Sequence, residues 1–154
     1  MNLSPSTLDL LLRPLHLVPM AIRIVAGARG IQSLELLRKP PASGPGRPLP
    51  RAASPHLAHA ARELTLYFEG RLRRFTVPVD LSGQGTDFQR RVWRVLQGIP
   101  YGSVVSYAWV ASRVGLPRGA RAVGGAVGRN PLPVIIPCHR VVGSEGRLTG
   151  FSSG

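Results

Sequence analysis

The segment IIPCHRVV, residues 135–142, contains Cys138, the only cysteine of the chain, between Pro137 and the pair His139 and Arg140. A thiol attacks as its thiolate, and a neighbouring base or cation promotes that ionisation near neutral pH. His139 and Arg140 supply a base and a cation, and Pro137 stiffens the backbone before the sulfur. A lone cysteine is also commonly a small buried hydrophobic residue. These residues alone therefore support a nucleophile and a packing residue about equally.

The same cysteine bears on cellular location. One cysteine excludes an internal disulfide and offers no set of zinc ligands, which favours a reducing, cytoplasmic protein without a metal. No run of residues approaches the roughly 18 apolar side chains that a membrane span requires. The most apolar stretch, residues 10–28, is interrupted by charged side chains and lacks the features of a signal peptide. We therefore expect no membrane association.

The charge of the chain favours a polyanionic partner. Lys and Arg number 20 against 7 Asp and Glu, a formal net charge of +13, and Lys39 is the one lysine. The planar guanidinium group grips phosphate through two parallel hydrogen bonds, so a nucleic acid heads the list of partners. The alternative is an arginine-rich solvated surface that reflects codon usage. Composition alone leaves both interpretations open.

The elements that must position Cys138 fall into two segments. In the first, residues 21–37 read as two apolar strands joined in a hairpin, and residues 40–54 are rich in Pro, Gly and Ser, as in a loop. Apolar residues recur at helical spacing over 56–72, and residues 73–81 read as another short strand. We therefore predict a small mixed α/β domain over residues 1–80.

The second segment is helical. Thr86 and Gln89 stand at capping-box positions before a helix. Its predicted apolar face consists of Phe88, Val92, Val95 and Leu96. A further helix is predicted from Ser106 to Gly115, followed after a turn by the small-residue helix of residues 120–130. This order indicates a helix-turn-helix. Small residues allow a close approach to DNA or tight packing on a neighbouring helix, and spacing does not decide between them.

Several motifs together resemble one family. The stretches FQRRVWRVLQGIPYGSVVSY, SYAWVA, RAVGGAVGRNPLPVIIPCHRVV and GFSSG are similar to the O6-alkylguanine-DNA alkyltransferases, also called methylated-DNA–protein-cysteine methyltransferases. The resemblance is continuous from Thr86 to Gly154 and weaker before it. It implies an α+β fold with a small ribonuclease H-like α/β N-terminal domain, residues 1–80. A helical, winged helix-turn-helix-like domain that binds DNA and carries out catalysis would follow over 86–154.

The resemblance also implies an activity. The family moves a methyl or other alkyl group from O6 of guanine, and we expect also from O4 of thymine, in double-stranded DNA onto its own cysteine. Each molecule reacts once, with no metal or organic cofactor, and we expect a monomer. The resemblance implies that Cys138 accepts the alkyl group, that His139 acts as a base through water, and that Tyr107 donates a hydrogen bond to the leaving guanine. It further implies that Asn130 braces the active-site turn and that Val141 and Ser152 contact the substrate base. The implied DNA contacts are Arg121, as the finger that fills the vacated stack, with Ala122, Gly125, Arg129 and Ser106.

One departure and two alternatives accompany this hypothesis. The family continues past GFSSG into a segment with a glutamate that orients the histidine, whereas this sequence ends at Gly154. We therefore expect a C-terminally truncated domain and slow transfer. A non-catalytic protein that binds alkylated DNA and recruits other repair factors is the main alternative, but such proteins lack the cysteine. A sequence-specific regulator would need long polar side chains on its second helix, and residues 120–128 offer almost none.

Overall fold

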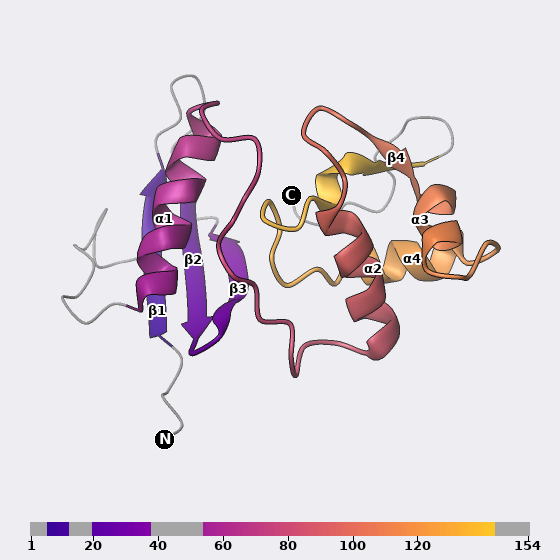
Figure 1. Ribbon diagram of the computed structural model, residues 1–154, viewed down its shortest axis with the longest axis horizontal. Helices are drawn as coiled ribbons and strands as arrows, with labels where there is room; N and C mark the ends of the chain where they lie inside the picture. Colours follow the sequence, from indigo (N-terminus) through magenta and orange to yellow (C-terminus); the bar gives the residue numbers. More distant parts are fainter. Residues whose placement is uncertain (1–5, 13–19, 38–53, 144–154) are drawn as a thin grey trace. The chain divides into compact units, whose positions relative to one another are not determined.

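The computed structural model describes residues 6–12, 20–37 and 54–143, and it confirms the predicted α+β class (Figure 1). The chain forms two compact units, Met1–Asp80 and Leu81–Gly154. Within the described residues, no helix has the length and apolarity that crossing a membrane would require. The two units differ in construction, one built on a sheet and the other on short helices.

The first unit is an antiparallel sheet covered by one helix. Strands β1 (Ser6–Leu12), β2 (Met20–Gly27) and β3 (Gly30–Leu37) lie in the order β1-β2-β3. The predicted hairpin is therefore confirmed as β2 and β3. Helix α1 (Pro55–Phe68) lies against one face of this sheet (Figure 1).

Helix α1 begins as its sequence dictates. The hydroxyl of Ser54 accepts a hydrogen bond from the His56 N–H at 3.3 Å, and a proline occupies the first helical position. Leu57, Ala60 and Leu64 are buried at helical spacing and form the face that packs on the sheet. The helical spacing predicted over residues 56–72 is thus confirmed for most of its length.

The strand expected over residues 73–81 is wrong. Only Val79 makes an isolated bridge, to Ile31 of β3. The backbone N–H groups of Thr76 and Val77 instead donate to the Glu63 carboxylate at 2.9–3.0 Å. Pro78 has no N–H to give, so no run of donors remains for a strand ladder. The loop predicted for residues 40–54 lies, except for its last residue, outside the described part of the chain.

Over residues 81–143, the second unit consists of three helices, a 3-10 turn and a minimal sheet. Its elements are α2 (Asp87–Gln97), β4 (Val105–Ser106), α3 (Tyr107–Arg113), α4 (Ala120–Val127), the 3-10 turn η1 (Cys138–Arg140) and β5 (Val141–Val142). The capping box of Thr86 and Gln89 forms as predicted, and Gly115, at φ +78°, ends the turn after α3. The predicted helix-turn-helix is thereby confirmed as α3 and α4.

The core of this unit centres on Trp93 of α2. Its ring is 2% exposed, and its indole N–H donates to the Ala126 carbonyl of α4 at 2.8 Å. Of the apolar face predicted for α2, Val92 and Leu96 are buried, whereas Phe88 and Val95 are only half-buried. The prediction missed Trp93, although a large apolar side chain three residues before Leu96 was a usable signal.

Candidate active site and nucleic-acid interface

Cys138 lies at a tight backbone turn. Pro137 has φ −78° and ψ 68°, the geometry of an inverse γ-turn, and the Cys138 N–H donates to the Ile136 carbonyl at 2.8 Å. The 3-10 turn η1 starts at Cys138, with the Arg140 N–H donating to the Pro137 carbonyl at 3.1 Å. The cysteine is 7% exposed. The backbone thus presents one thiol in a fixed and largely covered position.

Asn130 spans the approach to this turn. Its side-chain amide donates to the Ile136 carbonyl at 2.8 Å, and its side-chain oxygen accepts from the Leu132 N–H at 3.0 Å. Between these contacts, Val134 has φ 75°, a left-handed conformation that β-branched residues rarely adopt. The two bonds of Asn130 therefore hold an unusual loop directly before Cys138.

A short parallel pairing brings a tyrosine to the same place. Val105 of β4 pairs with Val141 of β5, and Tyr107, the first residue of α3, follows β4 immediately. Burial, and then the nearby Cys138, raise the pKa of Tyr107 above its ordinary value of 10.0. A Cβ at Gly124 would lie 3.8 Å from the tyrosine ring, so α4 also passes beside it. The phenol stays protonated at neutral pH and can donate a hydrogen bond.

His139 is half-buried next to the thiol. Burial, and then the positive charge of Arg140, lower the pKa of His139 below its ordinary value of 6.5. The imidazole is therefore neutral near pH 7, and a neutral imidazole can accept a proton. Among the described residues, no group of three or more His, Cys, Asp or Glu side chains is arranged to hold a metal ion.

Helix α4 has two unlike faces. Val123, Ala126 and Val127 are buried, and Ala126 packs on Trp93. The opposite face is exposed and carries the predicted DNA contacts Arg121, Ala122 and Gly125, and the exposed Arg129 follows just after the helix ends. The interpretation of the small residues as tight packing therefore holds for the buried face of α4, and the other face leaves residues of the helix exposed.

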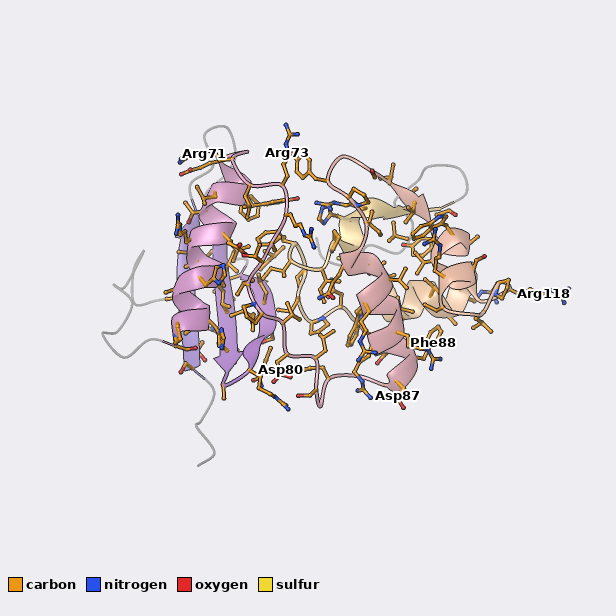
Figure 2. The ribbon with its side chains drawn as sticks, in the orientation of Figure 1. Arg71, Arg73, Asp80, Asp87, Phe88 and Arg118 are labelled. Atoms are coloured by element: carbon orange, nitrogen blue, oxygen red, sulfur yellow. The ribbon has the colours of Figure 1, made fainter. Side chains whose placement is uncertain are left out.

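The remaining predicted residues occupy different settings. The Ser106 hydroxyl accepts from the Trp109 N–H at 3.1 Å, so it caps α3. Val141 is 1% exposed in β5. Arg118, in the turn before α4, points away from the helices (Figure 2). Ser152 and the expected truncation concern residues 144–154, which lie outside the described ranges. Sequence reasoning missed Gly124 beside Tyr107, for which no local signal existed.

The C-terminal part of the chain is similar to a known domain. The family profile described as 6-O-methylguanine DNA methyltransferase, DNA binding domain matches residues 87–154. A methylated-DNA–protein-cysteine methyltransferase of Mycolicibacterium paratuberculosis is 50% identical over 97 residues, 63% of this chain and 58% of that protein. One from Methanosarcina barkeri is 53% identical over 95 residues, 62% of this chain and 59% of that protein. The chain thus spans somewhat more than half the length of these curated relatives.

Solved structures are similar over nearly the whole chain. The crystal structure of Mycobacterium tuberculosis OGT in complex with DNA has a TM-score of 0.73 at 37% identity, covering 97% of this chain and 85% of that one. The O6-methylguanine methyltransferase of the same species has a TM-score of 0.73 at 35% identity, covering 97% and 86%. The Pyrococcus kodakaraensis O6-methylguanine-DNA methyltransferase, at 22% identity, covers 93% and 88% with a TM-score of 0.59, and that likeness shows the fold alone.

Proposed function

Because the chain belongs to the methylated-DNA–protein-cysteine methyltransferase family, we propose that it repairs DNA by transferring an alkyl group from O6 of guanine to its own Cys138. The supporting observation is the β4–β5 pairing, because Tyr107 directly follows β4 and the turn with Cys138 directly precedes β5; the nearby Cys138 also raises the pKa of Tyr107. An in-line displacement needs a nucleophile and a donor to the leaving group within one site.

The bonds made and broken follow from these two groups. The thiol proton passes through water to His139, and the sulfur forms a bond to the alkyl carbon while the carbon–O6 bond breaks. The pair of electrons of that bond leaves with guanine, which the Tyr107 phenol stabilises by a hydrogen bond and which takes up one proton. The neutral His139 and the protonated Tyr107 are the states that this sequence of steps requires. The thioether left on Cys138 has an unactivated carbon–sulfur bond that nucleophiles do not readily break, so each molecule reacts once.

We propose α4 as the surface that meets double-stranded DNA. Its exposed face carries only small side chains between Arg121 and Arg129, so the helix backbone can approach the duplex closely. Extruding a nucleotide costs a few kcal/mol, and Arg121 at the start of α4 is placed to fill the vacated stack. Ser106, Ala122 and Gly125 would add contacts, and Val141 and Ser152 would meet the base. O4 of thymine has the same alkylated-oxygen chemistry and is included in the proposal.

The proposed setting is a cytoplasmic monomer that uses no cofactor. The thiol of Cys138 must stay reduced to react, and a reducing compartment provides that condition. Cys138 accepts the alkyl group, His139 takes the thiol proton, and Tyr107 donates a hydrogen bond to the leaving guanine. The proposed transfer therefore uses only side chains of this chain.

The test is transfer of label. The protein is incubated with a duplex that contains O6-[³H-methyl]guanine, and the label is mapped by peptide digestion. We expect label on the peptide that contains Cys138, and none with Cys138→Ser. Absence of label, while the relative from Methanosarcina barkeri reacts under the same conditions, would refute the proposal. Tight binding of the alkylated duplex without label would instead support the non-catalytic alternative.

A further inference from the structure

The side chain of Arg140 reaches back to a distant part of the second unit. Its guanidinium donates from Nη1 to the Ile99 carbonyl at 2.7 Å, and the two residues are 41 positions apart. The guanidinium carbon also lies 5.5 Å from the centroid of the Tyr101 ring, within cation–π range. Arg140 is itself half-buried. The last residue of the turn that carries Cys138 is thus bound to the segment that follows α2.

The Ile99 carbonyl belongs to a buried and hydrogen-bonded residue. Ile99 is 2% exposed, and its own N–H donates to the Leu96 carbonyl at 3.0 Å, directly after the end of α2. A hydrogen bond from a charged donor is roughly twice as strong as a neutral one. The bond from Arg140 therefore links the active-site turn to a buried residue that closely follows the end of α2.

This bond closes a loop around the site. The chain runs from Ile99 through residues 100–104 into β4, and β4 pairs with β5, which directly follows Arg140. The side-chain bond and the strand pairing therefore fasten the same two segments at two neighbouring points. Tyr107 begins where β4 ends, and Cys138 lies at the start of the turn that Arg140 ends. The hydrogen bond and the strand pairing thus both constrain the position of the Tyr107 backbone relative to that of Cys138.

We propose that Arg140 is a positioning residue for the alkyl transfer, because its bond to Ile99 and its contact with Tyr101 fix the Cys138–Arg140 turn relative to the strand that leads to Tyr107. The inference rests on the proposed function and deepens it. Arg140 acts through the placement of Cys138, His139 and Tyr107, and no contact with the substrate is part of its role.

The first measurement is the rate of transfer from free O6-benzylguanine, followed by the mass of the intact protein. This substrate needs no DNA, so binding to a duplex does not enter. Arg140→Met removes both the donor and the charge, and we expect the rate to fall on the order of tenfold or more, since misplacing a reacting group by about 1 Å costs on the order of 100-fold. Arg140→Lys keeps a charge and one donor and should restore much of the rate. Tyr101→Leu, which leaves the bond to Ile99 in place, should lose less. Arg91→Met, at an exposed site on α2, is the matched control.

The pH profile distinguishes positioning from a general loss of structure. The charged group that acts on His139 is Arg140, the next residue of the same turn, and Cys138 precedes His139 in that turn. Because the charge of Arg140 lowers the pKa of His139, Arg140→Met should move the acid limb of the rate to higher pH. Arg140→Lys should leave the acid limb of the pH–rate profile at the same pH as in the wild type. Partial unfolding would lower the rate at every pH without moving the limb.

The outcomes separate this inference from the function on which it rests. If the wild type reacts and Arg140→Met reacts as fast as Arg91→Met, the positioning role is overturned while the function stands. A rate that falls equally in the Met and Lys variants, with an unmoved acid limb, also overturns it. If the wild type transfers nothing from either O6-benzylguanine or an alkylated duplex, both fail. Slower transfer in Arg140→Met, a shifted limb and rescue by Lys would establish the role.

Discussion

The two units of this chain use charge in opposite ways. Five of the seven acidic residues lie within residues 1–80, where the buried ones hold the fold together. Glu63 accepts from Thr76 and Val77, and Asp80 accepts from Gln32 and pairs with Arg29 at 3.4 Å. In the first unit, charge is part of the internal structure.

The second unit has almost no acidic partner for its arginines. Between Phe88 and Ser144 the sequence contains no Asp or Glu. The arginines in that span are Arg90, Arg91, Arg94, Arg113, Arg118, Arg121, Arg129 and Arg140. Arg90 pairs with Asp87, Arg113 stacks on the Trp109 ring at 4.3 Å, and Arg140 binds a backbone carbonyl. Positive charge that no carboxylate neutralises is what a polyanion can use. Net charge does not separate the two units, because residues 1–80 carry 11 Lys and Arg against 5 Asp and Glu, and residues 81–154 carry 9 against 2. The units differ in that the first places carboxylates inside its fold, as Glu63 and Asp80.

Removing Glu63 should give the largest effect on the first unit. Glu63→Ala leaves the Thr76 N–H, the Thr76 hydroxyl and the Val77 N–H without their acceptor. An unsatisfied donor costs about 1–3 kcal/mol when buried. Val77 is buried and Thr76 is exposed, so the penalty falls mainly on the Val77 N–H, and we expect the free energy of unfolding to drop by about 1–3 kcal/mol. Hydrogen exchange of peptides from the first unit measures the loss. Both tryptophans, Trp93 and Trp109, lie in the second unit, so their fluorescence reports that unit separately.

The acid dependence of the same site gives the control. Burial raises the pKa of Glu63, but the hydrogen bonds from Thr76 and Val77 and the charge of His59 outweigh it, and the pKa ends below the ordinary 4.5. A lowered carboxylate pKa contributes stability that is present above about pH 4.5 and is lost as the pH falls through the folded-state value. Glu63→Ala should lack this acid transition. Glu69 is the exposed partner of Arg71, and Glu69→Ala should lower the free energy of unfolding by less than about 1 kcal/mol. Equal losses in both variants would contradict the contrast drawn between buried and exposed acids.

Substituting Arg121 should give the next largest effect, confined to the second unit and to duplex substrates. Arg121→Ala should slow transfer from duplex DNA by roughly 10- to 100-fold, because extruding the base costs a few kcal/mol that the arginine helps to offset. Transfer from free O6-benzylguanine should hardly change, because no base has to leave a stack. Arg118→Ala, whose side chain points away from the helices in Figure 2, is the matched control. Equal losses on the two substrates would remove Arg121 from the proposed role.

Sequence reasoning succeeded where the signals are local. The caps at Thr86 and Ser106 and the glycine at 115 define the ends of α2 and α3 from side chains a few residues away. It failed at residues 73–81, where the apolar pattern suggested a strand but a carboxylate 13 residues earlier captures the N–H groups.

The candidate site shows the same division. The motif around Cys138 left a nucleophile and a packing residue open, and the family resemblance supplied the predicted chemistry. The contacts that assemble the candidate site are long-range. The β4–β5 pairing and the bond from Arg140 to Ile99 join segments that no period or spacing in the sequence connects. The two faces of α4 were likewise undecided until Ala126 was found packed on Trp93, with Gly125 left exposed.

The smallest expected effect is on the salt dependence of DNA binding, and it tests the comparison of the two units directly. Each phosphate neutralised by an arginine makes log affinity fall by about 0.9 per unit of log salt. Arg129 is exposed directly after the end of α4, and its guanidinium donates a hydrogen bond to the Gly125 carbonyl of that helix at 3.3 Å. Arg129→Ala should therefore reduce the salt slope by roughly 0.9, whereas Arg62→Ala, exposed on α1 of the first unit, should leave the slope unchanged. Fluorescence anisotropy with an unmodified duplex over a series of salt concentrations measures both. A slope reduced equally by the two variants would show that the first unit also contacts DNA, and the assignment of its charge to folding alone would then be wrong.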